Sequence, residues 1–126
     1  MRNRGFSLIE LMIAIAVLAL LVGIAIPAYQ GYIAESRSGA ARANAEHLRT
    51  AVEDYFLDNE SYTGLNGLVW DGNGTTTTDP SPNPLGWSPT GDDGQYDYTI
   101  TAPAATRYTI TVKNIHGGTT ASLSRN

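Results

Sequence analysis

Near the N-terminus, Gly5, Phe6 and Glu10 have residue types and a spacing that suit processing at a membrane, within the stretch RGFSLIEL. A peptidase cutting between Gly5 and Phe6 would remove both leader arginines and create a new amine on Phe6. The formal net charge would change from −4 to −6, since two positive residues leave. That amine, from the same chain or a neighbouring one, is the nearest candidate partner for the Glu10 carboxylate.

The residues that must position this chemistry form a long apolar segment. No charged residue stands between Leu11 and Ile26, and counted back to Phe6 the segment has about the length of a bilayer-spanning helix. Because arginines precede it, the positive-inside tendency predicts a cytoplasmic N-terminus and an exported remainder. A cleaved secretory signal is the rival interpretation. The length of the segment and the lack of a small-x-small site after Ile26 count against it.

Glu10 is costly in this setting. A carboxylate in the bilayer costs on the order of 3 kcal/mol or more unless it is paired. Two interpretations stay open: Glu10 pairs with a Phe6 amine and sets the axial register between staggered helices, or it reaches back to the cytoplasmic headgroups.

The segment from Gly23 to Pro27 is predicted to be the softest part of the helix. Proline has no N–H and clashes with the carbonyl four residues earlier, and glycine is a weak helix former. The segment is either a simple kink at the membrane surface or a stretch that extends when subunits pass from bilayer to filament.

Helical periodicity continues beyond Pro27 to about Leu57. The whole helix would then be roughly 75 Å long at about 1.5 Å per residue. No core that this chain can build covers such a length, so we expect lipid or other copies to cover the first half. One apolar face is predicted for the second half, formed by Leu48, Ala51, Val52, Tyr55 and Phe56.

The rest of the helix surface is predicted to be polar or small. Arg42 with Glu46, and Arg49 with Glu53, stand at i,i+4 spacing on the expected solvated side. The alanine-rich stretch 34–45 suits close approach of another helix rather than a globular core.

After the helix the chain reads as a small polar head. Residues 61–94 are rich in Gly, Pro, Thr and Asp and predict a long loop. Alternating patterns then predict strands over 96–101, 108–113 and 120–123, with a hairpin connection at 102–106 and a turn at 114–118. The predicted fold class is α+β, with the sheet covering the apolar face of the helix.

The segments expected along the chain are a leader (1–5), a membrane and assembly helix (6–28), an amphipathic half of the same helix (29–58) and a head (59–126). The head divides into the loop (59–94) and the sheet (95–126).

Several kinds of chemistry find little support. The chain has no cysteine, and its net acidity argues against a dedicated nucleic-acid surface. The two histidines are expected on the surface, and no nucleophile–base arrangement appears, so we expect neither an enzyme nor a cofactor or metal site. The acidic cluster of the head does not have EF-hand spacing, and solvated turns are the favoured interpretation; its members are Asp71, Asn73, Asp92, Asp93 and Asp97.

Two further patterns are weak. Asn59-Glu60-Ser61 and Asn73-Gly74-Thr75 match the glycosylation tripeptide.

The residues from Arg4 to Leu11, the apolar run and Pro27 together resemble the N-terminal signature of type IV pilins and pseudopilins. The resemblance covers residues 1 to about 60, with Ser7 where the family often has Thr. It implies a prepilin peptidase that cuts after Gly5 and methylates the Phe6 amine, and a role for Glu10 in registering subunits. It also implies the type IV pilin fold.

The partners that the resemblance implies are identical or related pilin subunits, the peptidase, an inner-membrane assembly platform and, before assembly, the bilayer. The chain would start as a single-pass inner-membrane protein and end in an extracellular pilus. Many pilins close their C-terminal region with a disulfide, so here packing alone is expected to hold it.

Three functions remain open at this point. The first is a subunit, major or minor, of a type IV pilus that serves adhesion, twitching motility or DNA uptake. The second is a pseudopilin of a type II secretion system, with its filament in the periplasm. The third is a monomeric ligand-binding protein anchored by one helix, which would need neither Gly5-Phe6 nor Glu10.

Overall fold

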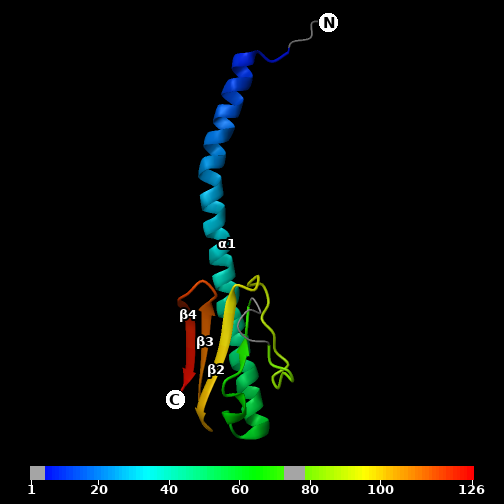
Figure 1. The fold of residues 1–126 in the computed structure, drawn as a ribbon, viewed down its shortest axis with the longest axis vertical. Coiled ribbons are helices and arrows are strands. Elements are labelled where there is room, and N and C mark those ends of the chain that lie inside the picture. Colours follow the sequence, from blue (N-terminus) through cyan, green and yellow to red (C-terminus); the bar gives the residue numbers. More distant parts are fainter. Residues whose placement is uncertain (1–4, 73–78) are drawn as a thin grey trace. The chain divides into compact units, whose positions relative to one another are not determined.

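The computed structural model describes residues 5–72 and 79–126 and divides the chain into two compact units, Met1–Glu35 and Ser36–Asn126. The long helix α1 (Leu8–Asn59) belongs to both units (Figure 1). It begins two residues after the expected start at Phe6, and it ends two residues after the expected end near Leu57.

A reciprocal pair of hydrogen bonds starts α1. The Ser7 hydroxyl accepts from the Glu10 backbone N–H at 3.2 Å, and a Glu10 carboxylate oxygen accepts from the Ser7 backbone N–H at 3.1 Å. This capping box satisfies two backbone donors that a helix start otherwise leaves open. Ser7 and Glu10 therefore define the first turn within one chain.

The helical part of the N-terminal unit exposes its apolar side chains. α1 is long and apolar enough to cross a membrane, with a mean hydropathy of 2.8 in its best 18-residue window, and none of that window is buried. Leu20 and Ile24, for example, are 71% and 72% exposed. Among the described residues, this unit has nothing of its own to cover these side chains.

Pro27 lies inside α1, and the helix continues through both Gly23 and Pro27. The extension of this segment during assembly stays a prediction.

The second unit contains an antiparallel sheet with the strand order β1-β2-β3-β4 (Figure 1). Its strands are β1 (Val69–Trp70), β2 (Tyr96–Ala104), β3 (Arg107–Asn114) and β4 (Thr119–Arg125), and a short 3-10 helix η1 (Thr63–Leu65) precedes them. The three predicted strands are confirmed. The α+β fold class is confirmed as well.

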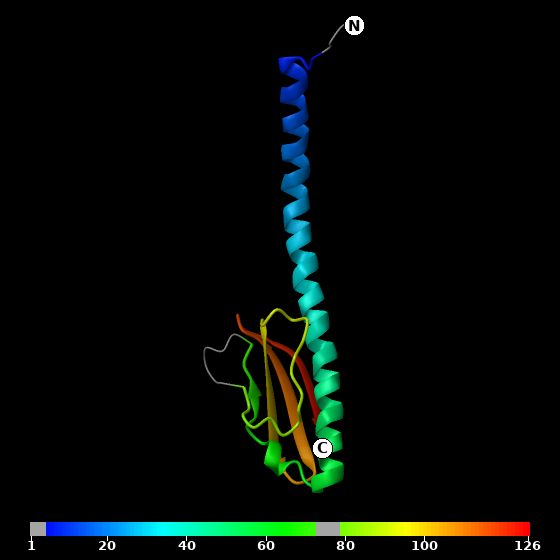
Figure 2. The same ribbon diagram turned by 90° about the vertical axis from the view of Figure 1, so that its right-hand side faces the viewer.

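The sheet lies against the part of α1 that begins near Ala41 (Figure 2). Leu48 and Val52 are fully buried against inward-facing residues of β2 and β3, such as Ile100 and Ile110, as the apolar face predicted. The expectation for the alanine-rich stretch was wrong at its C-terminal end, because Ala41 and Ala45 are core residues too. Their small side chains let the sheet approach the helix closely.

Two features of the sheet differ from the sequence prediction. β1 was missed because two residues are too few to show a period; it pairs with β2 through Val69 and Thr99. The β2–β3 hairpin is tighter than predicted, since Ala104 already pairs with Arg107. The ladder is irregular between Thr101 and Ala104, which accommodates the proline between them.

Glu60 closes the C-terminal end of α1 in an unfavourable conformation. Its φ is 54°, the left-handed region, and its backbone N–H donates to the Phe56 carbonyl at 2.7 Å. Glycine is the residue that usually occupies this position of a helix end.

We therefore predict that Glu60→Gly raises the free energy of unfolding by about 0.5–1 kcal/mol, because relief of the Cβ clash outweighs the added freedom of the unfolded chain. Denaturant unfolding of the full chain in detergent measures the change. Asp54→Gly, at an exposed position inside α1, is the control and should lower stability by about 1 kcal/mol. A loss of stability in Glu60→Gly contradicts the prediction.

Candidate assembly site

The predicted processing site precedes α1 in irregular chain. Phe6 is 88% exposed, and a Cβ placed on Gly5 would meet nothing within 4 Å. Both residues thus stand clear of the described chain. The leader residues 1–4 lie outside the described residues.

Glu10 is exposed at the start of α1, within hydrogen-bonding distance of Ser7. Its carboxylate has a partner in its own chain, the Ser7 backbone N–H. The Ser-x-x-Glu spacing is the capping-box pattern and could have predicted this contact from the sequence, but the contact was not among the predictions. The Phe6–Glu10 pairing between chains stays a prediction.

A second cluster of charged and aromatic groups surrounds Glu53. The hydroxyls of Tyr62 and Tyr108 each donate to the Glu53 carboxylate at 2.8 Å, and the Arg125 guanidinium donates to it at 2.6 Å. The guanidinium also lies over the Phe56 ring at 5.6 Å. The cluster thus joins α1, the segment after it, β3 and β4.

The observed ion pairs differ from the two predicted along the helix. Glu53 pairs with Arg125 rather than with Arg49, and Arg49 instead lies 3.8 Å from Glu46. Within residues 5–72 and 79–126, Arg42 makes no ion pair with Glu46 either. The C-terminal strand is also held by more than packing, because Arg125 near its end is tied to Glu53.

A buried polar network attaches the segment before β2 to α1. Asn44 donates to the Tyr98 hydroxyl at 3.0 Å and to the Thr90 carbonyl at 2.8 Å, and the Tyr98 hydroxyl donates to Asp92 at 2.7 Å. Burial, together with the Asp92 carboxylate, raises the pKa of Tyr98 and keeps its hydroxyl protonated as a donor. The prediction of a solvated turn was wrong for Asp92, which is 4% exposed.

Other acidic residues of the cluster considered in the sequence analysis are also buried or bonded within the second unit. Asp71 is buried, and Asp97 accepts from the Gly72 backbone N–H at 2.9 Å. Asp93 forms an ion pair with Arg37 at 2.8 Å. No group of three His, Cys, Asp or Glu side chains that could hold a metal ion occurs in the described part of the chain. Asn73, and with it one glycosylation tripeptide, lies outside that part.

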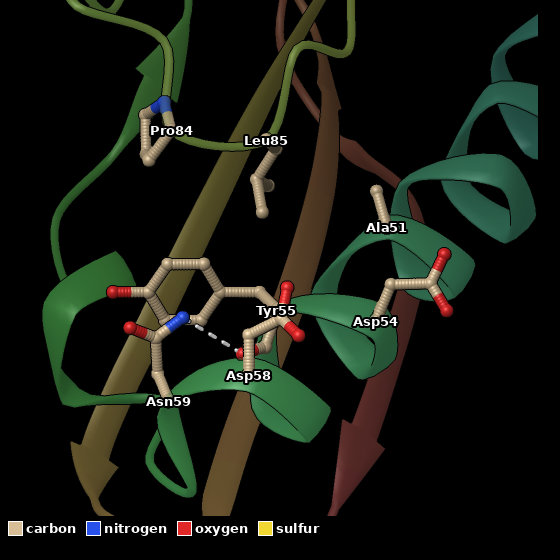
Figure 3. Close-up of a pocket in the computed structure, with 7 residues that line it drawn as sticks. All are labelled: Ala51, Asp54, Tyr55, Asp58, Asn59, Pro84 and Leu85. Atoms are coloured by element: carbon tan, nitrogen blue, oxygen red, sulfur yellow. Dashed lines mark hydrogen bonds between the residues drawn. The ribbon is translucent and has the colours of Figure 1, made fainter.

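A pocket of about 300 Å³ lies beside the last turns of α1. Figure 3 shows its lining, with the carboxylates of Asp54 and Asp58 on the helix and Pro84 and Leu85 on the opposite side. The Asn59 side chain at its edge donates to the Tyr55 carbonyl at 2.9 Å. The glycosylation tripeptide that begins at Asn59 therefore has its acceptor amide engaged in the fold. His47 and His116 are exposed, as predicted.

Two features define the class of type IV pilin-like proteins. One is an exposed apolar helix that follows Phe6 and carries Glu10 in its first turn, and the other is a four-stranded antiparallel sheet packed on the later part of that helix. Residues 1–26 match the model of the prokaryotic N-terminal methylation motif. Residues 27–122, more than half of the chain, match the family model described as type IV minor pilin ComP, DNA uptake sequence receptor. The chain belongs to this type IV pilin family.

Named relatives agree with this family. The chain is 37% identical over 110 residues to the type IV major fimbrial protein FimA of Dichelobacter nodosus, covering 82% of this chain and 64% of FimA. It is 35% identical over 101 residues to the type IV major pilin protein PilE1 of Neisseria gonorrhoeae, covering 79% of this chain and 39% of PilE1.

A shorter match joins it to the type IV major pilin protein PilA of Myxococcus xanthus, with 42% identity over 62 residues, 49% of this chain and 28% of PilA. The chain thus spans less than two thirds of the length of these curated relatives. No solved structure matches the chain.

The electrostatics of the Glu53 cluster make stability depend on pH. Burial alone would raise the pKa of Glu53, but the hydrogen bonds from Tyr108 and Tyr62 and the charge of Arg125 outweigh it and lower the pKa. Burial and Glu53 together raise the pKa of Tyr108 to about 12. Glu53 thus stabilises the fold at pH values above its unfolded-state pKa of about 4.3. This contribution is lost as the pH falls through the lower pKa that Glu53 has in the folded state.

We predict that Glu53→Gln lowers the free energy of unfolding at neutral pH by about 1 kcal/mol, a value discounted for the solvent exposure of the site. The variant should also lose less stability than the wild type between neutral pH and the acid range. Unfolding of the full chain in detergent at several pH values measures both effects. Asp58→Asn, at an exposed position, is the matched control; equal pH dependence in wild type and Glu53→Gln contradicts the assignment.

Proposed function

We propose that this chain is a structural subunit, major or minor, that is trimmed, methylated on Phe6 and polymerised into a type IV pilus. The observation that carries the proposal is the exposed apolar start of α1, which lies within the matched methylation motif of residues 1–26. A surface of this kind is stable only against lipid or against the same surface of other copies. The relatives are named as pilins and fimbrial proteins, which supports cover by other copies of the same helix.

The processing step draws support from the local structure. The bond between Gly5 and Phe6 precedes the first helical turn, in irregular chain that is exposed to a peptidase. In this proposal the trimmed chain stays in the inner membrane with its N-terminus in the cytoplasm. An assembly platform then transfers it into the filament outside the cell.

Glu10 has two roles in the proposal, at successive stages. In the single chain it caps α1 through Ser7, and in the filament its charge pairs with the Phe6 amine of a neighbour. The two roles differ chemically, because capping needs only a hydrogen-bond acceptor whereas pairing with an ammonium group needs a negative charge. Substitution can therefore separate them.

We predict that Glu10→Gln abolishes surface filaments while the helix content of the membrane-embedded chain stays unchanged. The Gln side chain retains the capping acceptor and loses the charge. Ser7→Ala makes the complementary change: it removes the capping hydroxyl, at a cost of about 1 kcal/mol to the helix start, and keeps the carboxylate, so filaments should persist.

Electron microscopy of surface filaments and circular dichroism of the purified chain give the two readouts. Normal filaments in Glu10→Gln would exclude registration by charge. If these filaments also lack this chain, the result favours a protein anchored by one helix, whose function does not need this carboxylate. A periplasmic filament in place of a surface pilus would favour the secretion pseudopilin.

DNA contact is a second candidate function, favoured by the description of the matching family as a DNA uptake sequence receptor. The charge of the head restricts it. Ten acidic and six basic residues follow position 36, and two of the six, Arg37 and Arg125, lie within 2.8 Å of carboxylates. Arg107 and Lys113 are exposed on β3 and are the cations best placed to meet phosphates.

If the head contacts DNA, its affinity should depend only modestly on salt. Each neutralised phosphate adds about −0.9 to the slope of log K against log salt, so we predict a slope no steeper than about −3. Binding of duplex DNA to the full chain in detergent, titrated with salt, measures it. Loss of binding in Arg107→Glu/Lys113→Glu would place the contact on β3, and no binding at about 50 mM salt would exclude this function.

A further inference from the structure

We propose that the groove between α1 and β4 receives α1 of a second, parallel copy of this chain, with Arg42 of one copy paired to Glu46 of the next. The proposal rests on the filament-forming function above and assigns a subunit contact to the head. It is carried by the shape of the groove, its two charges and their spacing.

The groove has the composition of a protein–protein interface. It has a volume of about 350 Å³, and its lining consists of Arg42, Ala43, Ala45, Glu46, Ala121 and Leu123. Four of the six lining side chains are thus apolar, and the other two are one cation and one anion. An apolar centre with a polar rim is typical of surfaces that bind another protein.

Both charges are available to a partner. Arg42 makes no ion pair within residues 5–72 and 79–126, although Glu46 stands four residues later on the same helix. Among the described residues, the ion-pair contact of the Glu46 carboxylate is with Arg49 at 3.8 Å, and the Glu46 and Arg49 side chains are 61% and 50% exposed. An exposed pair of this kind contributes little to stability, so Glu46 can exchange it for a better partner.

The pattern is complementary to itself when one copy is displaced along the helix axis. Four residues of an α-helix advance about 6 Å, so a neighbour shifted by that distance brings its Glu46 level with Arg42. Phe6 also precedes Glu10 by four residues, although it lies before the first helical residue, so both contacts require a displacement in the same direction. The small side chain of Ala43 allows the two helices to approach closely.

The displacement also determines the kind of assembly. Copies that share a bilayer insert in the same direction, so their α1 helices run parallel. Arg42 of each copy then contacts Glu46 of the next, which is a heterologous interface that leaves a free groove at the end. Such an interface, repeated with a rotation, generates an open filament rather than a closed dimer.

Charge reversal in cells tests the contact. Arg42→Glu alone and Glu46→Arg alone should each lower the number of surface filaments more than about tenfold, because like charges meet at every junction. The double variant Arg42→Glu/Glu46→Arg should restore filaments. Co-expression of the two single variants should restore them too, since alternating copies recreate opposite charges at each junction.

Rescue between copies is the decisive readout. An ion pair inside one helix would be rescued by the double variant but not by co-expression, and that result would overturn the proposal. Normal filaments in both single variants would overturn it as well. Asp58→Arg, a charge reversal on α1 away from the groove, is the matched control and should leave filament number unchanged.

A covalent readout does not depend on filaments. The chain has no cysteine, so in two differently tagged copies carrying Arg42→Cys and Glu46→Cys a bis-maleimide can join unlike tags only between these two positions. We expect a dimer with both tags after treatment of membranes with a short bis-maleimide, which spans the wider gap of an Arg–Glu pair that a disulfide does not reach. The pair Arg42→Cys and Asp58→Cys should give none, since the two positions are too far apart along the helix axis for this reagent.

The two experiments separate this contact from the filament function. A mixed-tag dimer in cells without filaments supports the contact and contradicts the pilus. Filaments without the mixed-tag dimer, or a cross-linked adduct with a different protein in its place, overturn the contact and leave the pilus intact.

Discussion

The exposed apolar surface of α1 is the constraint on which the account depends. Large apolar side chains from Leu8 to Ile26 are mostly more than half exposed, and the described residues of the unit that contains them include no second helix or strand to cover them. Burial of apolar surface lowers the free energy by about 25 cal/mol per Å². A single chain in water with this surface exposed therefore has a much higher free energy than a chain whose apolar surface is covered. In the proposed function, lipid covers it in one state and sister helices cover it in the other. The capping box at Ser7 and Glu10 starts α1 in the single chain.

The head, by contrast, is stabilised by its own contacts. Its core is apolar, and two polar clusters tie its segments to α1: Glu53 with Tyr62, Tyr108 and Arg125, and Asn44 with Tyr98 and Asp92. These clusters fasten the C-terminal strand and the long loop in a chain that has no cysteine with which to do so. A head of this kind can keep its fold while the cover of the N-terminal helix changes.

Periodicity predicted most of this fold, and contact partners could not be predicted from it. The helix, the three longer strands and the face of Leu48 and Val52 follow from local patterns of 3.6 and 2 residues. β1 is too short for any pattern, and the partner of Glu53 is Arg125, 72 residues away, where local spacing suggested Arg49. At the candidate site, Gly5, Phe6 and Glu10 are recognisable from their spacing, and the Ser7 cap was readable too, but the groove of Arg42 and Glu46 exists only once β4 lies beside α1.

The intact mass of this chain in filaments sheared from the cell surface tests the central claim most directly. The account predicts a chain that begins at Phe6 and carries a methyl group on its amine, present as a component of the filaments. It is contradicted if the filaments lack this chain, or if the chain is found only in the membrane and still begins at Met1 while the processing peptidase is active.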